Sequence, residues 1–219
     1  MSVATAAVPT NAVRNYVLGV LVVVYTFNFI DRQILSILME AIKLDLGLSD
    51  KALGFLAGFA FALFYAVLGI PIAMWADRGN RRNVIALAIA IWSVMTALSG
   101  LAQNFTHLAL ARIGVGIGEA GCTPPAHSII SDYYRPEERA TALGIYALGI
   151  PLGIMFGMFA GGWINEHFGW RKAFFVVGIP GLLLALIVRF TIREPARGHS
   201  ENRADEAERP PFVETMRFL

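Results

Sequence analysis

The sequence predicts an all-α integral membrane protein in which six transmembrane helices form a three-plus-three inverted repeat. Six apolar stretches are each long enough to cross a bilayer, and short polar loops join them. Only 16% of the 219 residues are charged, against 56% that are hydrophobic. The third observation is a pair of similar loops three spans apart. An odd number of crossings places these loops on opposite sides of the membrane, as an inverted repeat requires.

This composition excludes several classes of protein. An ordinary soluble domain is less apolar, and a net charge of +2 gives no reason to expect a nucleic-acid partner. Cys122 is the single cysteine, so an intramolecular disulfide is impossible, and the 4 histidines show no metal-site spacing. We therefore expect membrane lipids around the protein and no cofactor.

The six predicted spans hold 19 to 24 residues each, against the roughly 20 that a bilayer core requires. Spans two, three and five contain no Asp, Glu, Lys or Arg, whereas spans one and four contain charges of both signs. In chain order the spans cover Tyr16–Met39, Leu53–Ala76, Val84–Ala102, Leu108–Ile130, Thr141–Ile164 and Ala173–Ile192.

This pattern divides the chain into an N-terminus (1–15), a six-helix domain (16–192) and a polar tail (193–219). The apolar run after Arg14 is too long for a signal peptide and no cleavage site follows it, so we expect the first span to be retained. The tail has the mixed charge of a linker, and an amphipathic helical pattern begins at residue 212.

The placement of Lys and Arg predicts a multi-pass protein of the cell (inner) membrane with both termini in the cytoplasm. Cytoplasmic loops carry an excess of these residues, and here twelve lie on the side of the termini against four on the other. The twelve are Arg14, Arg78, Arg81, Arg82, Arg135, Arg139, Arg189, Arg193, Arg197, Arg203, Arg209 and Arg217, and the four are Lys43, Lys51, Arg171 and Lys172.

The two similar loops follow spans two and five. Each combines a Trp, an acidic residue and the pattern Gly-x-basic-basic, which begins at Gly79 in the first loop and at Gly169 in the second. An inverted repeat of three spans is the building plan of many secondary transporters. Coincidence between two short loops is the alternative.

Span four places Arg112 and Glu119 within the membrane, on one helix face with Gly116. An ionisable group at such depth costs roughly 2.5–3.5 kcal/mol, so proteins tend to keep one only where it has a function. Arg112 alone could reach the headgroups from its position near the start of the span. Pro124 and Pro125 should disturb the helix near its other end.

Span one adds Asp31 and Arg32 at a comparable depth. A rise of 1.5 Å per residue places Asp31 about 12 Å, Arg112 about 6 Å and Glu119 about 16 Å from the outer end. If spans one and four are neighbours, we expect Asp31 to meet Arg112. Arg32 can then meet Glu119. A purely structural pair of salt bridges is the alternative, although apolar residues would join two helices at lower cost.

These four residues suit a site that couples protons to an anionic substrate. A carboxylate in apolar surroundings tends to hold its proton, whereas a nearby guanidinium favours the charged form. An arginine that moves would therefore switch the proton on or off. The same switch would follow when a substrate carboxylate or phosphate binds the arginine through paired hydrogen bonds.

The loop over residues 77–82 is the candidate gate. The positive-inside bias explains Arg78, Arg81 and Arg82, but it does not explain Asp77 at the very end of a helix. Charged residues after span four, among them Asp132, are possible partners, although that cluster taken alone is typical of a solvated loop.

Span five repeats a glycine every four residues, and this ridge predicts tight contact with a neighbouring helix. A flexing hinge at Pro151 is the alternative. The ridge consists of Gly149, Gly153, Gly157 and Gly161.

Together these features resemble the N-terminal half of a major facilitator superfamily (MFS) transporter. The superfamily signature between helices two and three is Gly-x-x-x-Asp-Arg-x-Gly-Arg-Arg, and residues 73–82 read Ala-Met-Trp-Ala-Asp-Arg-Gly-Asn-Arg-Arg. Ala73 replaces the first Gly, and the second Gly stands one position early. The run from Arg112 to Ala120, with Asp31-Arg32 in helix one and Phe-Gly-Trp-Arg over 168–171, resembles the Spinster group and its bacterial homologues.

The resemblance implies one half of a twelve-helix MFS fold and transport by alternating access, without enzymatic activity. It implies a lipid-like or amphipathic organic anion, such as a sphingosine phosphate or a lysolipid, moved with protons. A proton-coupled symporter of small organic anions is the alternative. The family's roles carry over as proton and substrate binding at Asp31, Arg32, Arg112 and Glu119, and as gating at Asp77, Arg78, Arg81 and Arg82.

A membrane enzyme or a passive channel is a more remote alternative. A channel conducts without a proton gradient, whereas a coupled carrier saturates and stops when it is uncoupled. The charged faces of spans one and four also require a facing wall, because exposure to lipid would be costly. We therefore expect a C-terminal six-helix half as a partner, and we expect this chain to be half of the working protein.

Overall fold

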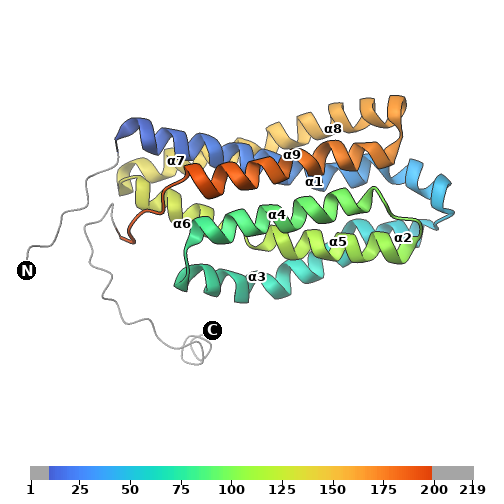
Figure 1. Cartoon of the computed structure of the whole chain (residues 1–219), viewed down its shortest axis with the longest axis horizontal. Coiled ribbons are helices and arrows are strands. Elements are labelled where there is room, and N and C mark those ends of the chain that lie inside the picture. The colour runs from blue at the N-terminus through green and yellow to red at the C-terminus, as the bar shows by residue number, and fades with distance from the viewer. Residues whose placement is uncertain (1–9, 199–219) are drawn as a thin grey trace, which may run out of the picture.

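The computed structural model describes residues 10–198, so the predicted amphipathic segment from residue 212 lies outside the described residues. Within that range the chain forms helices joined by short loops, and no strand is present (Figure 1). The helices are α1 (Asn11–Leu46), α2 (Asp50–Gly54), the π-helix η1 (Phe55–Phe59), α3 (Ala60–Arg78), α4 (Arg81–Ser99), α5 (Phe105–Ala120), α6 (Thr123–Tyr133), α7 (Pro136–Ala147), α8 (Gly149–Phe168) and α9 (Trp170–Thr191).

Five helical segments between residues 10 and 198 are long and apolar enough to cross a membrane, where the sequence predicted six. The difference lies in the fourth span, which the structure divides into α5 and α6 at Gly121 and Cys122. Pro124 and Pro125 stand at the start of α6, where their missing N–H groups break the helical hydrogen bonding as predicted. The two short helices together still run the length of the bundle (Figure 1).

Short polar side chains and glycines determine where the helices begin and end. The side chains of Thr10, Asn80 and Asn104 each accept a hydrogen bond from the backbone N–H three residues later, at the starts of α1, α4 and α5. Gly47 ends α1 with φ of 64°, and Gly169 joins α8 to α9 with φ of 83°. Only glycine adopts such backbone angles without strain, so these two turns are fixed by the sequence.

The packing of the helices has the symmetry that the predicted inverted repeat requires. Extensive contacts join α1 with α8, α3 with α5, and α4 with α9, and α4 also packs extensively against α5. An inverted repeat exchanges span one with span four, span two with span five, and span three with span six. It therefore relates the contact of α1 with α8, which joins spans one and five, to the contact of α3 with α5, which joins spans two and four. The contact of α4 with α9 joins spans three and six, so the exchange leaves it unchanged. The three-plus-three arrangement is therefore confirmed.

The glycine ridge of α8 lies directly against α1. A Cβ atom added at Gly153 would lie 2.5 Å from the backbone oxygen of Thr26, closer than any real contact allows. Tight packing is thus the confirmed interpretation, and the helix break falls at Leu148, before Pro151. The buried glycines of this face are Gly149, Gly153, Gly157 and Gly161.

Two apolar clusters fill the bundle, and a polar layer lies between them. Along α1, Leu21 and Val24 belong to one cluster and Ile34 and Leu38 to the other. Asp31 lies between the two clusters and is 1% exposed. We call the end of the bundle where α1 begins and α9 ends the basic end. The hydroxyls of Tyr16 and Thr191 join these two helices there, at 2.7 Å.

Candidate functional site

The four residues predicted to bind protons and substrate lie together in the polar layer. Arg32 Nε on α1 donates a hydrogen bond of 2.6 Å to Glu119 Oε2 on α5. Arg112 Nη1 on α5 lies 3.6 Å from Asp31 Oδ1 on α1, an ion pair beyond ordinary hydrogen-bond distance. Both predicted pairs are therefore present, and long side chains bridge the two helices.

The members of this cluster differ sharply in exposure. Asp31 and Arg112 are 1% and 2% exposed, and Glu119 is completely buried. The Arg32 side chain is 26% exposed. Arg32 is thus the member of the four whose side chain is appreciably exposed.

A hydroxyl from a third helix completes the layer. Thr96 Oγ1 on α4 donates a hydrogen bond of 2.6 Å to Asp31 Oδ2. No sequence pattern predicts this contact, because a lone threonine in an apolar span usually bonds its own helix. Among the described residues, both amide atoms of the buried Asn28, Oε1 of Glu119, and Nε and Nη1 of Arg112 have no hydrogen-bond partner. The layer therefore keeps unused donors and acceptors next to its charges.

Three aromatic rings surround the Arg32 guanidinium. Its central carbon lies 5.1 Å from the ring centroid of Phe29, 5.1 Å from that of Phe61 and 5.0 Å from that of Tyr65. All three distances are within the range of cation–π attraction. Sequence reasoning missed these rings, since an aromatic residue in an apolar span is most often a packing residue.

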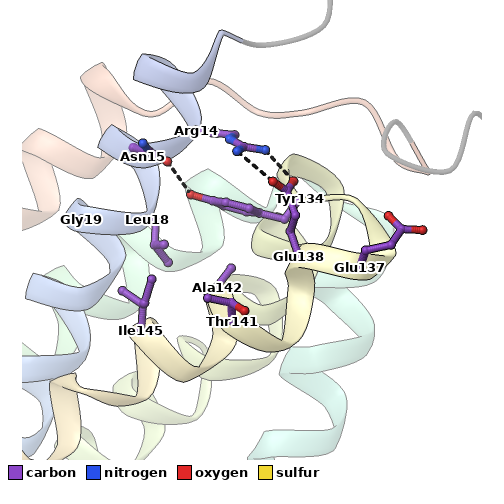
Figure 2. Close-up of a pocket in the computed structure, with 10 residues that line it drawn as sticks. All are labelled: Arg14, Asn15, Leu18, Gly19, Tyr134, Glu137, Glu138, Thr141, Ala142 and Ile145. Atoms are coloured by element: carbon purple, nitrogen blue, oxygen red, sulfur yellow. Dashed lines mark hydrogen bonds and ion pairs between the residues drawn. The ribbon is translucent and has the colours of Figure 1, made fainter.

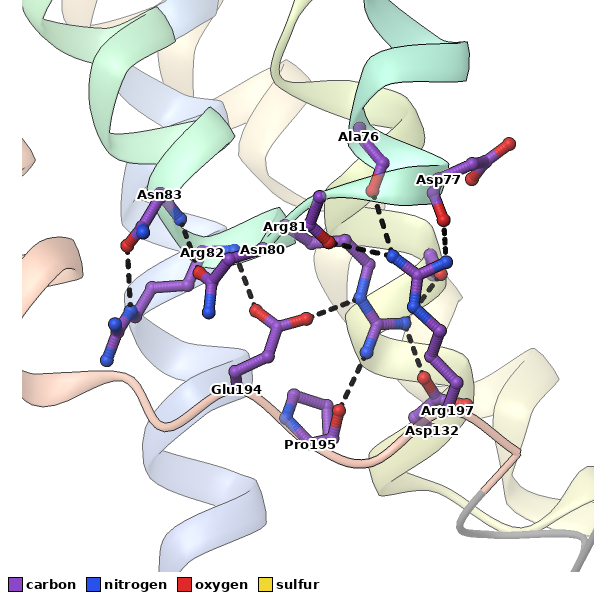
Figure 3. Close-up of polar contacts among 12 residues, drawn as sticks. Ala76, Asp77, Asn80, Arg81, Arg82, Asn83, Asp132, Glu194, Pro195 and Arg197 are labelled. Atoms are coloured by element: carbon purple, nitrogen blue, oxygen red, sulfur yellow. Dashed lines mark hydrogen bonds and ion pairs between the residues drawn. The ribbon is translucent and has the colours of Figure 1, made fainter. Parts of the chain in front are cut away.

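The predicted gating residues differ in their burial and contacts. Arg81 is 1% exposed and forms the centre of an ion cluster at the basic end (Figure 3). Its guanidinium donates to Glu194 at 2.7 Å, to the Ser128 hydroxyl at 2.8 Å and to the Pro195 carbonyl at 2.9 Å. It also pairs with Asp132 on α6. Arg81 thus holds α4, α6 and the segment after α9 together.

The other three gating candidates lie around this cluster. The backbone N–H of Arg82 donates a hydrogen bond of 2.8 Å to Glu194, whereas Asp77 and Arg78 are exposed. Figure 3 shows the Asp77 carboxylate directed away from Arg81. The interpretation of the segment after span four as a solvated loop is wrong for Asp132. Asp132 is only 8% exposed, because α6 brings it beneath the start of α4.

The first residues of the predicted linker are bound to the bundle. The Arg197 guanidinium donates to the carbonyl oxygens of Ala76, at 3.2 Å, and of Gly79, at 2.8 Å, and also to that of Asp77 (Figure 3). It therefore satisfies backbone acceptors at the end of α3. Residues 193–198, which the sequence identified as polar linker, lie across the ends of α3, α4 and α6 instead of extending into solvent.

A groove of about 610 Å³ opens at the basic end between α1 and α7 (Figure 2). Arg14 and Glu138 close one side through two hydrogen bonds of 2.6 and 3.0 Å. The predicted proton, substrate and gating residues are absent from its described lining, so it is separate from the polar layer. The lining consists of Arg14, Asn15, Leu18, Gly19, Tyr134, Glu137, Glu138, Thr141, Ala142 and Ile145.

Metal-binding geometry is absent from the described part of the chain. Residues 10–198 hold no group of three His, Cys, Asp or Glu side chains placed to bind an ion. The chemistry of the polar layer is that of two carboxylates and two guanidinium groups, which exchange protons and bind anions.

Comparison with known proteins places the chain in a family. Residues 21–219 match the family model of the Major Facilitator Superfamily. An MFS-type efflux pump of Mycolicibacterium smegmatis is 42% identical over 80% of this chain and 41% of its own length. A probable galactarate/D-glucarate transporter of Bacillus subtilis is 32% identical over 93% of this chain and 46% of its own.

The fold also matches a solved structure. A bacterial homologue of the human lysosomal transporter Spinster, inward-facing and unoccupied, superposes with a TM-score of 0.81 at 44% identity. The match covers 95% of this chain and 49% of that protein, so the chain spans about half the length of the proteins that it matches. On its family match, its fold and the pairing of its helices, the chain belongs to the major facilitator superfamily.

Proposed function

We propose that this chain is the N-terminal half of a secondary active transporter that moves an amphipathic organic anion together with protons, by alternating access. We use the term intact transporter for this chain together with the second six-helix half that the proposal requires. The relatives named above are transporters and not enzymes, which supports a transport role.

The observation that carries the proposal is the pair of acid–base contacts in the polar layer. Glu119 is completely buried beside Arg32, and Asp31 is buried beside Arg112. A membrane bundle gains little stability from such pairs, because removing charges from water costs about as much as their attraction returns. Ionisable groups at this depth are typical of ion and proton pathways.

The geometry supports a simple exchange at Arg32. An anionic substrate that binds Arg32 competes with Glu119 for its guanidinium group. A buried carboxylate that loses its guanidinium partner favours the protonated form. Binding of the anion and binding of a proton by Glu119 therefore reinforce each other, and release of either favours release of the other.

The surroundings of Arg32 favour an amphipathic substrate. Phe29, Phe61 and Tyr65 place apolar ring surface beside the guanidinium. A lysolipid or a sphingosine phosphate combines an anionic head with an apolar body, whereas a sugar acid needs a polar partner for each hydroxyl. A small organic anion remains the second candidate, because the B. subtilis relative is a probable galactarate/D-glucarate transporter.

The basic end would face the cytoplasm. Its arginines outnumber the basic residues of the opposite end, as the positive-inside rule requires. In this orientation the Arg81 cluster lies at the cytoplasmic mouth, where a contact with the second half could open and close. We therefore assign gating to the loop over residues 77–82.

Competition for uptake tests the substrate class. The intact transporter would be reconstituted in proteoliposomes, with a radiolabelled short-chain alkyl phosphate as the substrate. We expect an excess of unlabelled lysophospholipid to inhibit this uptake and an excess of galactarate to leave it unchanged. Inhibition by galactarate alone would favour the second candidate instead.

A further inference from the structure

Arg32 lies between two kinds of partner. On one side Glu119 accepts its Nε–H at 2.6 Å. On the other, the Phe61 and Tyr65 rings of α3 and the Phe29 ring of α1 lie within 5.1 Å of its central carbon. We call these three rings the aromatic box. The rings come from two helices, so the box also bridges α1 and α3.

The box is built into the packing of the bundle. The Phe61 and Tyr65 rings stack on each other at 5.5 Å, with an angle of 23° between their planes. Phe61 lies against Gly116 of α5, where an added Cβ would approach the Phe61 backbone oxygen to 2.9 Å. A glycine at this position therefore brings α3, and with it two of the rings, close to the helix that carries Glu119.

A guanidinium without such a box would not stay in place. Arginine has a long flexible side chain, and in a membrane bundle it extends toward water whenever its carboxylate partner no longer attracts it. Ring faces attract a cation without forming a hydrogen bond, and this attraction is strongest where water is excluded. The box thus supplies the part of the Arg32 environment that does not change when the anionic partner changes.

We propose that Phe29, Phe61 and Tyr65 are positioning residues. They hold the Arg32 guanidinium in its present place while its anionic partner changes from the Glu119 carboxylate to the anionic group of a substrate. The inference rests on the proposed function, because it describes how the proposed substrate site keeps its charge in place. The rings themselves take no part in proton transfer.

Chemical modification of Arg32 tests the box without any transport measurement. An arginine-selective dicarbonyl reagent would be applied to the intact transporter, and peptide mass spectrometry would follow the modification of Arg32 relative to the exposed Arg78. We expect Phe61→Leu and Tyr65→Leu, combined, to raise the rate at Arg32 by roughly fivefold or more, since each lost ring contact weakens its retention. Tyr65→Phe keeps the ring face and should raise the rate much less than the combined variant does.

The matched control is Phe59→Leu. Phe59 precedes α3, is 58% exposed, and its ring lies against Phe55 at 5.5 Å instead of against Arg32. In this variant Arg32 should be modified at the wild-type rate. An equal rate in the wild type and in the Phe61→Leu and Tyr65→Leu variants would overturn the proposal. If the combined variant does not fold, the modification rate of the buried Arg112 will rise as well. In that case the single variants Phe61→Leu and Tyr65→Leu provide the test.

Protection by a ligand separates this inference from the proposed function. A short-chain alkyl phosphate should slow the modification of Arg32 in the wild type, with a half-protecting concentration that rises severalfold in the ring variants. If the rings control the reactivity of Arg32 but the phosphate gives no protection, the box stands and the proposed substrate class fails. If the phosphate protects equally with and without the rings, the box fails and the substrate class stands.

Discussion

Glu119 and Arg32 are the residues on which the proposed coupling depends. Glu119 uses one carboxylate oxygen to bind Arg32, and Oε1 has no hydrogen-bond partner within the described part of the chain. This oxygen can take a proton without first breaking a contact. A transporter that binds protons at this site would therefore need the carboxyl group itself and not only its hydrogen-bonding shape.

Replacement of Glu119 by its amide tests that requirement. Glu119→Gln keeps the size of the side chain and removes the titratable group, so we expect proton-driven uptake by the intact transporter to be lost. The variant should still fold in membranes, because the glutamine carbonyl can accept the hydrogen bond from Arg32. Glu40→Gln makes the same change at an exposed position of α1 and should transport normally. Proton-driven uptake at the wild-type rate in Glu119→Gln would exclude this carboxylate from coupling.

The Asp31–Arg112 pair makes a prediction about stability. Arg112→Leu leaves the buried Asp31 without its cation, and breaking such a pair typically destabilises a protein by about 3–5 kcal/mol. The double variant Asp31→Asn, Arg112→Leu removes both charges and should recover most of this loss. Denaturant unfolding in detergent, followed by circular dichroism, measures both. A double variant less stable than Arg112→Leu would contradict the pairing.

The residue pairs could be predicted from the sequence, but their surroundings could not. Charges in apolar spans are conspicuous, and counting residues along two helices placed the two pairs at overlapping depths. Thr96 and Phe61 have no such signal, because hydroxyls and aromatic rings are common in membrane helices. Their importance depends on which helix faces overlap, and that is a property of tertiary packing.

At the scale of the helices, close packing depends on glycine. A Cβ atom at Gly153 would lie 2.5 Å from both the Phe29 Cβ and the Thr26 backbone oxygen, so α8 could not keep its present distance from α1. Gly162, on the same helix, has no heavy atom within 4 Å of the position where a Cβ would stand. The two glycines therefore provide a matched pair for measuring the effect of helix contact.

Substitution by alanine separates the two positions. We expect Gly153→Ala to lower the thermal unfolding midpoint in detergent, because overpacking typically costs 1–3 kcal/mol. Gly162→Ala should leave the midpoint unchanged or raise it, since alanine favours a helix by about 1 kcal/mol over glycine. Equal midpoints for the two variants would show that the α1–α8 contact is looser than the structure indicates.

Helix positions could be predicted well from hydropathy, whereas the break in span four was only partly anticipated. Pro124 and Pro125 pointed to a disturbance, but α5 already ends at Ala120, and Gly121 there packs against Ala88 of α4. The binding of residues 193–198 to Arg81 and to the end of α3 was not predictable either. A polar segment of mixed charge has the same composition whether it is solvated or bound.

At the scale of the whole molecule, the loop over residues 77–82 should bias the balance between conformations. If Asp77 contacts the second half when the cytoplasmic mouth is closed, Asp77→Asn should increase the population that is open on that side. The Cys122→Ala, Ile145→Cys background places a reporter thiol in the groove of Figure 2. In inside-out vesicles, we expect Asp77→Asn to increase the rate at which this reporter thiol reacts with a membrane-impermeant maleimide.

Asp50→Asn is the control for this change. Asp50 pairs with Lys43 at the opposite end of the bundle, and its side chain is 83% exposed. Its removal should leave the labelling rate unchanged. An unchanged rate in Asp77→Asn would indicate that the loop determines topology and does not gate.

The proposal that this chain supplies half of the transport pathway predicts that residues 1–219 do not transport alone. The polar layer lies in one six-helix bundle, and alternating access requires a second bundle against which it can move. Residues 1–219 in proteoliposomes should show no uptake above that of empty liposomes, whereas co-reconstitution with the second half should restore it. Saturable uptake by residues 1–219 alone would show that a second half is unnecessary.

The most direct test of the central claim is the dependence of uptake on a proton gradient. Proteoliposomes that contain the intact transporter would be given a labelled alkyl phosphate, with a pH gradient applied and with the same gradient collapsed by a protonophore. The account predicts saturable uptake that the gradient drives and the protonophore abolishes. Uptake that proceeds equally after the gradient has been collapsed would contradict it.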